Sequence, residues 1–194
     1  MAILLAVSPV CPGAVTTSQQ IAQNYQEMRK NLAWLTLGLN DLGRGNDSKL
    51  KLTADQRKKI LPVFETLVGN NLVLLTAPPK RQHENQSQNR RQYDPNDPMA
   101  QARMRKQKEQ TDFGNKQADL IDAVLTPAQR SYIDNLNFNA EKYGFIDFRK
   151  LFGNGGPGQQ RPDQKVIDDM RTKMRAGQEA LIKLNNEVLK MLKS

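Results

Sequence analysis

One pattern, L-T-x-x-Q-R-x-x-I, occurs twice in this chain, at residues 52–60 and again at 125–133. In each copy a glutamine follows a threonine by three positions, which is the spacing of a helix capping box. The threonine hydroxyl accepts a hydrogen bond from the glutamine's backbone amide, and the glutamine side chain accepts one from the threonine's backbone amide. Two donors that a helix start leaves open are thereby satisfied. Each copy therefore predicts that a helix begins directly after its threonine, Thr53 or Thr126.

The apolar residues of the first and last parts of the chain recur at alternating intervals of four and three, which gives one apolar seam along a helix. The first seam consists of Ile21, Tyr25, Met28, Leu32, Leu35, Leu39 and Leu42, and the glycines that follow end its helix. The last seam starts after Asp163 and consists of Ile167, Met170, Met174, Gly177, Leu181, Leu184, Val188 and Met191. The simplest use of two matching seams is to pack on each other or across a dimer.

The two motif helices and the helix between them have apolar faces of their own. We expect the first to run from about Ala54 to Thr76, with Pro62 bending it. Its expected buried residues are Ile60, Val63, Phe64, Leu67, Leu74 and Leu75. Asp97-Pro98 is a good N-cap and first-turn pair for a helix whose core-facing residues are Phe113, Leu120, Ile121 and Val124. The second motif helix is expected to reach about Tyr143, carrying Tyr132, Ile133, Leu136 and Ala140.

These elements predict an all-α protein, because no segment shows convincing strand alternation. The chain has 194 residues, 38% of them apolar and only 6% aromatic, so one domain with a thin core is expected. Elongated helical hairpins or a curved helical layer suit such a core. We assign residues 19–194 to this domain, with a polar linker at 77–97 and a glycine-rich loop at 153–162. A core plug precedes that loop, formed by Phe145, Ile146, Phe148, Leu151 and Phe152.

Residues 1–18 form either the remnant of a secretory signal peptide or a disordered tail. Residues 2–10 are almost all apolar and small residues follow them, as in the exit of a signal, although no basic residue precedes the apolar run. Cys11 is the only cysteine, so no disulfide framework is expected. The export reading places the protein in the periplasm or another extracytoplasmic compartment. No stretch approaches the roughly 18 apolar residues that a membrane span needs.

The sequence assembles no catalytic or metal-binding arrangement. His83 is the only histidine and lies in the polar linker without a cysteine nearby, which argues against a metal centre of nitrogen and sulfur ligands. The glycines at 153–158 lack the ending of a phosphate-binding loop, and no nucleophile elbow is present. We therefore expect no enzyme, no cofactor and no small-molecule substrate.

Positive charge is the strongest compositional signal, since the formal net charge is +9. The cations concentrate in and after the linker, at Lys80, Arg81, Arg90, Arg91, Arg103, Arg105, Lys106 and Lys108. One interpretation is a solvated face that keeps the protein soluble. The other is electrostatic capture of an acidic partner, with Tyr93, Met99 and Met104 as adaptable apolar contacts.

The paired motif resembles the signature of the Spy and CpxP family of bacterial periplasmic proteins. The residues that carry the resemblance are Leu52, Thr53, Gln56, Leu125, Thr126 and Gln129, and it extends over about residues 49–145. It implies an all-helical protein that forms a cradle-shaped homodimer. It also implies the work of an ATP-independent chaperone or of an envelope-stress modulator.

We expect ATP-independent binding of unfolded or stress-exposed proteins in the bacterial envelope. One alternative is an envelope scaffold or stress-signalling regulator that docks a single protein partner. Another is nucleic-acid binding through the basic residues 80–108, which export would disfavour.

Overall fold

The computed structural model describes residues 18–45, 47–72, 97–146 and 163–194. Its elements are the helices α1 (Ser18–Arg44), α2 (Ala54–Gly69), α3 (Pro98–Asp122), α4 (Pro127–Asp134), the short 3-10 helix η1 (Ala140–Tyr143) and α6 (Gln164–Lys193). The described residues contain no strand, which confirms the predicted all-α class.

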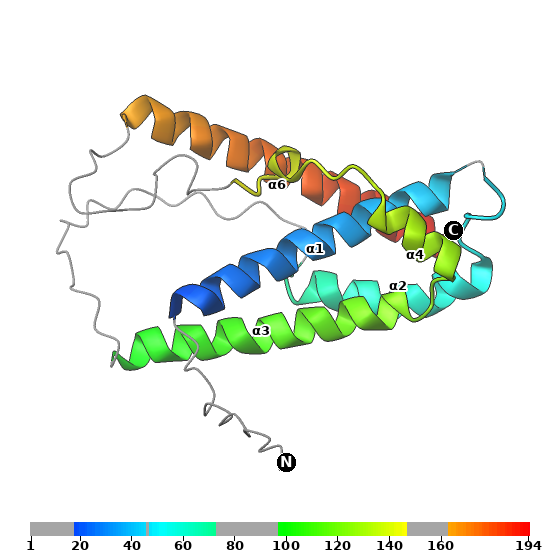
Figure 1. The fold of residues 1–194 in the computed structure, drawn as a ribbon, viewed down its shortest axis with the longest axis horizontal. Coiled ribbons are helices and arrows are strands. Elements are labelled where there is room, and N and C mark those ends of the chain that lie inside the picture. The colour runs from blue at the N-terminus through cyan, green and yellow to red at the C-terminus, as the bar shows by residue number, and fades with distance from the viewer. Residues whose placement is uncertain (1–17, 46, 73–96, 147–162) are drawn as a thin grey trace, which may run out of the picture.

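Helix α1 is the centre of the fold. It packs against α3 along one side and against α6 along another, while α4 lies near its far end and η1 lies on the middle of α6 (Figure 1). Helix α2 fills the space between α3 and α6 over part of their length. The first halves of α1 and α3 run together to one end of the molecule, whereas the first half of α6 diverges from them (Figure 1).

The core lies where α1, α2, α3 and α6 meet. It is built from fully buried side chains of all four helices, including Leu39, Phe64, Ile121 and Val188. A smaller cluster joins α1 to α6 and η1 through Ala33, Tyr143, Leu181 and Leu184. Burial of large apolar side chains supplies about 1.5–3 kcal/mol each, so these two clusters carry most of the packing energy of the described fold.

The first seam is confirmed in part. Met28, Leu32, Leu39 and Leu42 are buried, while the other three seam residues are half-buried. Helix α1 also buries residues outside the seam, among them Ala33, Thr36 and Asn40. The wider buried face follows from the position of α1 between two long helices, since a single seam covers only one contact.

The predicted start of each helix around the core is confirmed. Asp97 caps α3 by accepting a hydrogen bond from the Met99 amide at 3.0 Å, and Pro98 is the first helical residue. Asp163 caps α6 in the same way, with the Lys165 amide at 3.2 Å. In α6 the buried part of the seam begins at Gly177, and the earlier seam residues Ile167, Met170 and Met174 are half-buried.

The first motif helix ends at Gly69, so the predicted end at about Thr76 is wrong. Asn71 adopts a left-handed conformation with φ of 56°, which asparagine tolerates better than most residues. The Leu72 amide then donates to the Leu67 carbonyl at 3.1 Å, the hydrogen bond of a Schellman motif. Leu72 is only 1% exposed and supplies the apolar contact that accompanies such an ending. Helix α2 runs through Pro62.

The second motif helix is also shorter than predicted, because α4 ends at Asp134 and only a 3-10 turn forms near Tyr143. The Asn135 side chain donates to the Ser131 carbonyl at 2.7 Å, and the Asn139 side chain accepts from the Lys142 amide at 3.2 Å. Asparagines that bond the backbone locally compete with helix continuation. One core prediction in α3 is wrong as well, since Leu120 is 45% exposed.

Several predictions lie outside the described residues. They concern the N-terminal segment 1–17, the linker up to residue 96, the loop at 153–162, and His83, Leu74, Leu75, Phe148, Leu151 and Phe152. Of the predicted core plug, Phe145 and Ile146 are described and half-buried, and Phe145 packs on the smaller cluster.

Candidate functional site

Both capping boxes form as predicted. The Thr53 hydroxyl accepts from the Gln56 amide at 3.2 Å, and the Gln56 side-chain oxygen accepts from the Thr53 amide at 3.0 Å. The corresponding distances in the second copy are 3.3 Å for the Thr126 hydroxyl and 2.9 Å for the Gln129 side-chain oxygen. The motif therefore fixes the starts of α2 and α4.

The two boxes also bond to each other. Gln56 Nε2 donates to Gln129 Oε1 at 2.7 Å, and Gln129 Nε2 donates to Gln56 Oε1 at 3.2 Å. The second hydrogen of each glutamine side-chain amide is donated to a backbone carbonyl that directly precedes the other motif in the sequence. Gln56 Nε2 lies 3.0 Å from the Val124 carbonyl oxygen, and Gln129 Nε2 lies 3.1 Å from that of Leu50 and 3.4 Å from that of Lys51.

The Gln56–Gln129 pair is buried and fully bonded. Gln56 is 8% exposed and Gln129 is 1% exposed. Each oxygen accepts one bond from its own threonine and one from the other glutamine, which uses the full capacity of a primary amide. A buried polar network of this kind favours one arrangement, because any other leaves donors or acceptors unpaired. The motif thus joins the turn before α2 to the corner before α4.

The residues predicted to bind a partner, which are cations with Tyr93, Met99 and Met104 among them, divide into two groups. Five of them lie outside the described residues, namely Lys80, Arg81, Arg90, Arg91 and Tyr93. The other six lie in the first half of α3, where Met99, Arg103, Arg105, Lys106 and Lys108 are exposed and Met104 is half-buried. Met99, at 67%, has the largest exposed fraction among the exposed large apolar side chains of the described chain.

Helix geometry places these α3 residues on two different faces. Met99, Arg103 and Lys106 recur at intervals of four and three, so they share one face. Arg105 and Lys108 lie three positions apart on the opposite side. The single patch expected from the sequence is therefore two surfaces.

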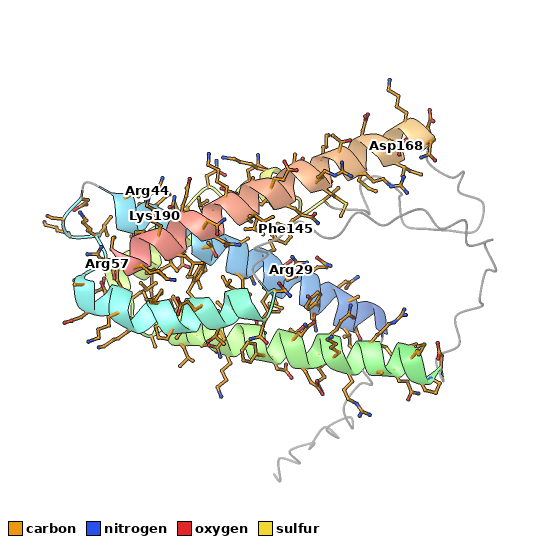
Figure 2. The ribbon with its side chains drawn as sticks, turned by 180° about the vertical axis from the view of Figure 1, so that it is seen from behind. Arg29, Arg44, Arg57, Phe145, Asp168 and Lys190 are labelled. Atoms are coloured by element: carbon orange, nitrogen blue, oxygen red, sulfur yellow. The ribbon has the colours of Figure 1, made fainter. Side chains whose placement is uncertain are left out.

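Two residues of α1 that sequence reasoning did not single out for binding, Tyr25 and Arg29, contact each other. Arg29 points out of α1 just beyond the end of α2, between α3 and the diverging half of α6 (Figure 2). Its guanidinium carbon lies 5.9 Å from the centre of the Tyr25 ring, within range of a cation–π contact. Its Nε is buried and has no hydrogen-bond partner among the described residues. In the sequence, Arg29 is a cation that directly follows the seam residue Met28, and nothing else in the sequence marks it for binding.

A separate titratable cluster lies where α1, η1 and α6 meet. Burial raises the pKa of the Asp41 carboxyl, and the nearby Arg44 guanidinium partly offsets this rise. Burial also raises the pKa of Tyr143, and the charges of Asp41 and Glu187 add to it. Arg44 Nη2 lies 3.4 Å from Glu187 Oε2. Because the folded-state pKa of Asp41 exceeds 3.8, its ionisation costs stability as pH rises from there through the folded-state value.

The described residues contain no group of three or more histidine, cysteine, aspartate or glutamate side chains that could hold a metal ion. Within the same part of the chain, no helix has the length and hydropathy to cross a membrane.

Comparison with known proteins gave no match: no family model, no curated protein and no solved structure is similar enough to this chain to be assigned.

Proposed function

We propose that this protein binds unfolded or stress-exposed proteins without nucleotide, as an exported chaperone similar to the Spy and CpxP family. The paired motif supports the resemblance, and the exposed basic half of α3 supports the activity. The main observation in favour of client binding is that Met99 is 67% exposed on a face of α3 that also presents Arg103 and Lys106. Cations attract acidic clients over a distance, and an exposed methionine adapts to varied apolar surfaces.

The test is suppression of aggregation of an acidic model client, without ATP and at low salt. Replacing Arg103, Arg105, Lys106 and Lys108 by glutamine removes four charges from α3 and is expected to weaken protection several-fold. The matched control removes four exposed cations from α6, by replacing Lys165, Lys173, Arg175 and Lys183 with glutamine. If the unmodified protein gives no protection at several-fold excess, the proposal is wrong. If both variants lose protection equally, α3 is not the surface that binds clients.

Two further binding measurements distinguish the other candidate functions, a docking regulator and a nucleic-acid-binding protein. A single saturable complex with one envelope protein, without general protection of clients, would favour a docking regulator. Affinity for an oligonucleotide that falls linearly with salt on logarithmic axes would favour nucleic-acid binding.

A further inference from the structure

Helix α2 covers only part of the surface formed by the parallel helices α1 and α3 (Figure 1). It has 16 residues and α3 has 25, which correspond to lengths of about 24 Å and about 37 Å. The bond from Gln56 to the Val124 carbonyl fixes the start of α2 beside the end of α3. From there α2 runs antiparallel to α3 and stops short of its first half (Figure 1). Because Gln56 is the third residue of α2 and Val124 lies two residues past the end of α3, α2 begins beyond that end, and at least about 13 Å of α3 lies past the end of α2.

One face of α3 runs from the part that α2 covers to the part beyond the end of α2. Phe113 and Val124 lie on this face and pack against the main core cluster, to which α2 contributes Phe64 and Leu67. The same spacing continues toward the start of α3 through Gln110, Lys106, Arg103 and Met99. These four residues are exposed or half-buried. One stripe is therefore covered by a helix over its second half and open over its first.

Helix α1 adds a cation and an aromatic ring beside the open half. Tyr25 and Arg29 are both half-buried, and Arg29 lies just past the end of α2 (Figure 2). Arg29, Arg103 and Lys106 form no ion pair within the described part of the chain. By contrast, Lys30 on another side of α1 pairs with Glu27 at 3.2 Å. The open half thus combines three unpaired cations with Tyr25 and Met99.

We propose that this open half of the α1–α3 pair binds an acidic amphipathic helix of a partner protein, in line with α2. A helix fits because α2 already packs as a helix on the same stripe. The length left open, at least about 13 Å, accommodates two helical turns or more. An apolar face flanked by carboxylates would contact Met99 and Tyr25 and pair with Arg29, Arg103 and Lys106. The inference rests on the proposed function, since it names the partner chemistry of part of the same basic surface.

The direct test uses the whole protein and labelled peptides, with binding followed by fluorescence anisotropy. The first peptide is an amphipathic helix with acidic flanks. The second has the same composition but carries central prolines, which prevent a helix. The third replaces its acidic residues by lysine. We expect the first peptide to bind at least tenfold more tightly than either of the others.

Two triple variants locate the site. Arg29→Gln, Arg103→Gln and Lys106→Gln are expected to weaken binding of the first peptide at least tenfold. The control variant changes Lys165→Gln, Arg175→Gln and Lys183→Gln, three exposed cations of α6, and should leave affinity within about twofold. Circular dichroism and thermal unfolding of both variants confirm that each is folded.

Distinct results would overturn the inference. Equal binding of the helical and proline peptides would show nonspecific charge attraction, and equal loss in both variants would do the same. If the first variant instead converts a dimer to a monomer in sedimentation experiments, the face is an interface between copies of this chain. None of these results removes the aggregation-suppression activity, which is measured separately, so failure of the inference and of the proposed function are distinguishable.

Discussion

The Gln56–Gln129 pair explains why both motifs carry glutamine. Glutamate at the third helical position serves a capping box equally well, because capping needs only an acceptor. The bonds between the two boxes need each side chain to donate and accept at once, with donor and acceptor at 2.7 and 3.2 Å in the two directions. An amide does this and an ionised carboxylate does not. The identity of these residues is therefore set by tertiary contact.

Two substitutions at Gln129 separate capping from pairing. Gln129→Ala removes both and leaves the Gln56 amide underbonded in the core, so unfolding free energy should fall by about 2–3 kcal/mol. Gln129→Glu keeps the acceptor for Thr126 but places a carboxylate against Gln56 Oε1 and the Leu50 carbonyl. Urea denaturation at neutral pH should show a loss for Gln129→Glu that is comparable to the loss for Gln129→Ala.

The pH dependence of Gln129→Glu provides the control. Burial beside the acceptor oxygens of Gln56 and Leu50 raises the folded-state pKa of the new carboxyl, so its penalty is present at neutral pH and fades as pH falls toward the unfolded value of about 4.3. Protonation restores a donor to the site. Unchanged stability of Gln129→Glu at neutral pH would show that the boxes act independently.

At the scale of elements, α6 meets η1 through two glycines. A side chain at Gly177 would overlap backbone atoms of Gly144, and Gly144 itself has φ of 80°, which most side chains disfavour. The close backbone approach lets the end of η1 lie directly on α6. The apolar seam in the sequence includes Gly177 as a core position. That η1 is the element packed against it follows only from the tertiary fold.

Gly177→Ala tests this contact. The added methyl forces the two elements apart, so we expect a loss of about 1–3 kcal/mol in unfolding free energy. The matched control is Gly69→Ala at the end of α2, where no atom lies within 4 Å of the added carbon, and its effect should be neutral or stabilising by up to about 1 kcal/mol. Chemical denaturation of both variants measures the difference. Equal effects would mean that the η1 contact contributes nothing beyond helix propensity.

The starts of the elements were more predictable than their ends. A helix start depends on a few neighbouring side chains: Thr53, Thr126 and Asp97 cap as expected, and α6 starts after Asp163 as expected. The ends of α2 and α4 depend on asparagines that stop a helix whose apolar pattern continues, and the prediction followed the apolar pattern. Asn71 was readable as a helix terminator from the sequence, whereas the exposure of Leu120 was not.

At the scale of the whole molecule, burial is uneven along the long axis. The fully buried apolar residues of α1 begin at Met28, those of α3 are confined to its last turns, and those of α6 begin at Leu181. The first halves of these helices have fewer neighbours (Figure 1). The same uneven coverage leaves the basic half of α3 accessible.

Amide hydrogen exchange should follow this gradient. We expect the amides of residues 18–27, 98–109 and 164–174 to exchange at least a hundredfold faster than those of 32–42, 60–68 and 181–192. Local opening of the sparsely packed ends costs less free energy than global unfolding. Mass spectrometry of peptic fragments reads out both sets. Uniform protection along α1 would show that another contact covers its first half.

Local sequence is enough to specify the helical class, the helix starts, the excess of positive charge and the division of the basic α3 residues between two helix faces. These follow from local spacing, capping chemistry and composition, which need no knowledge of distant contacts. The three-dimensional fold adds that the two motifs bond to each other, that α2 stops short of the first half of α3 and that Arg29 lies just past the end of α2. These properties depend on which distant backbone segments meet, and one-dimensional periodicity does not specify that choice.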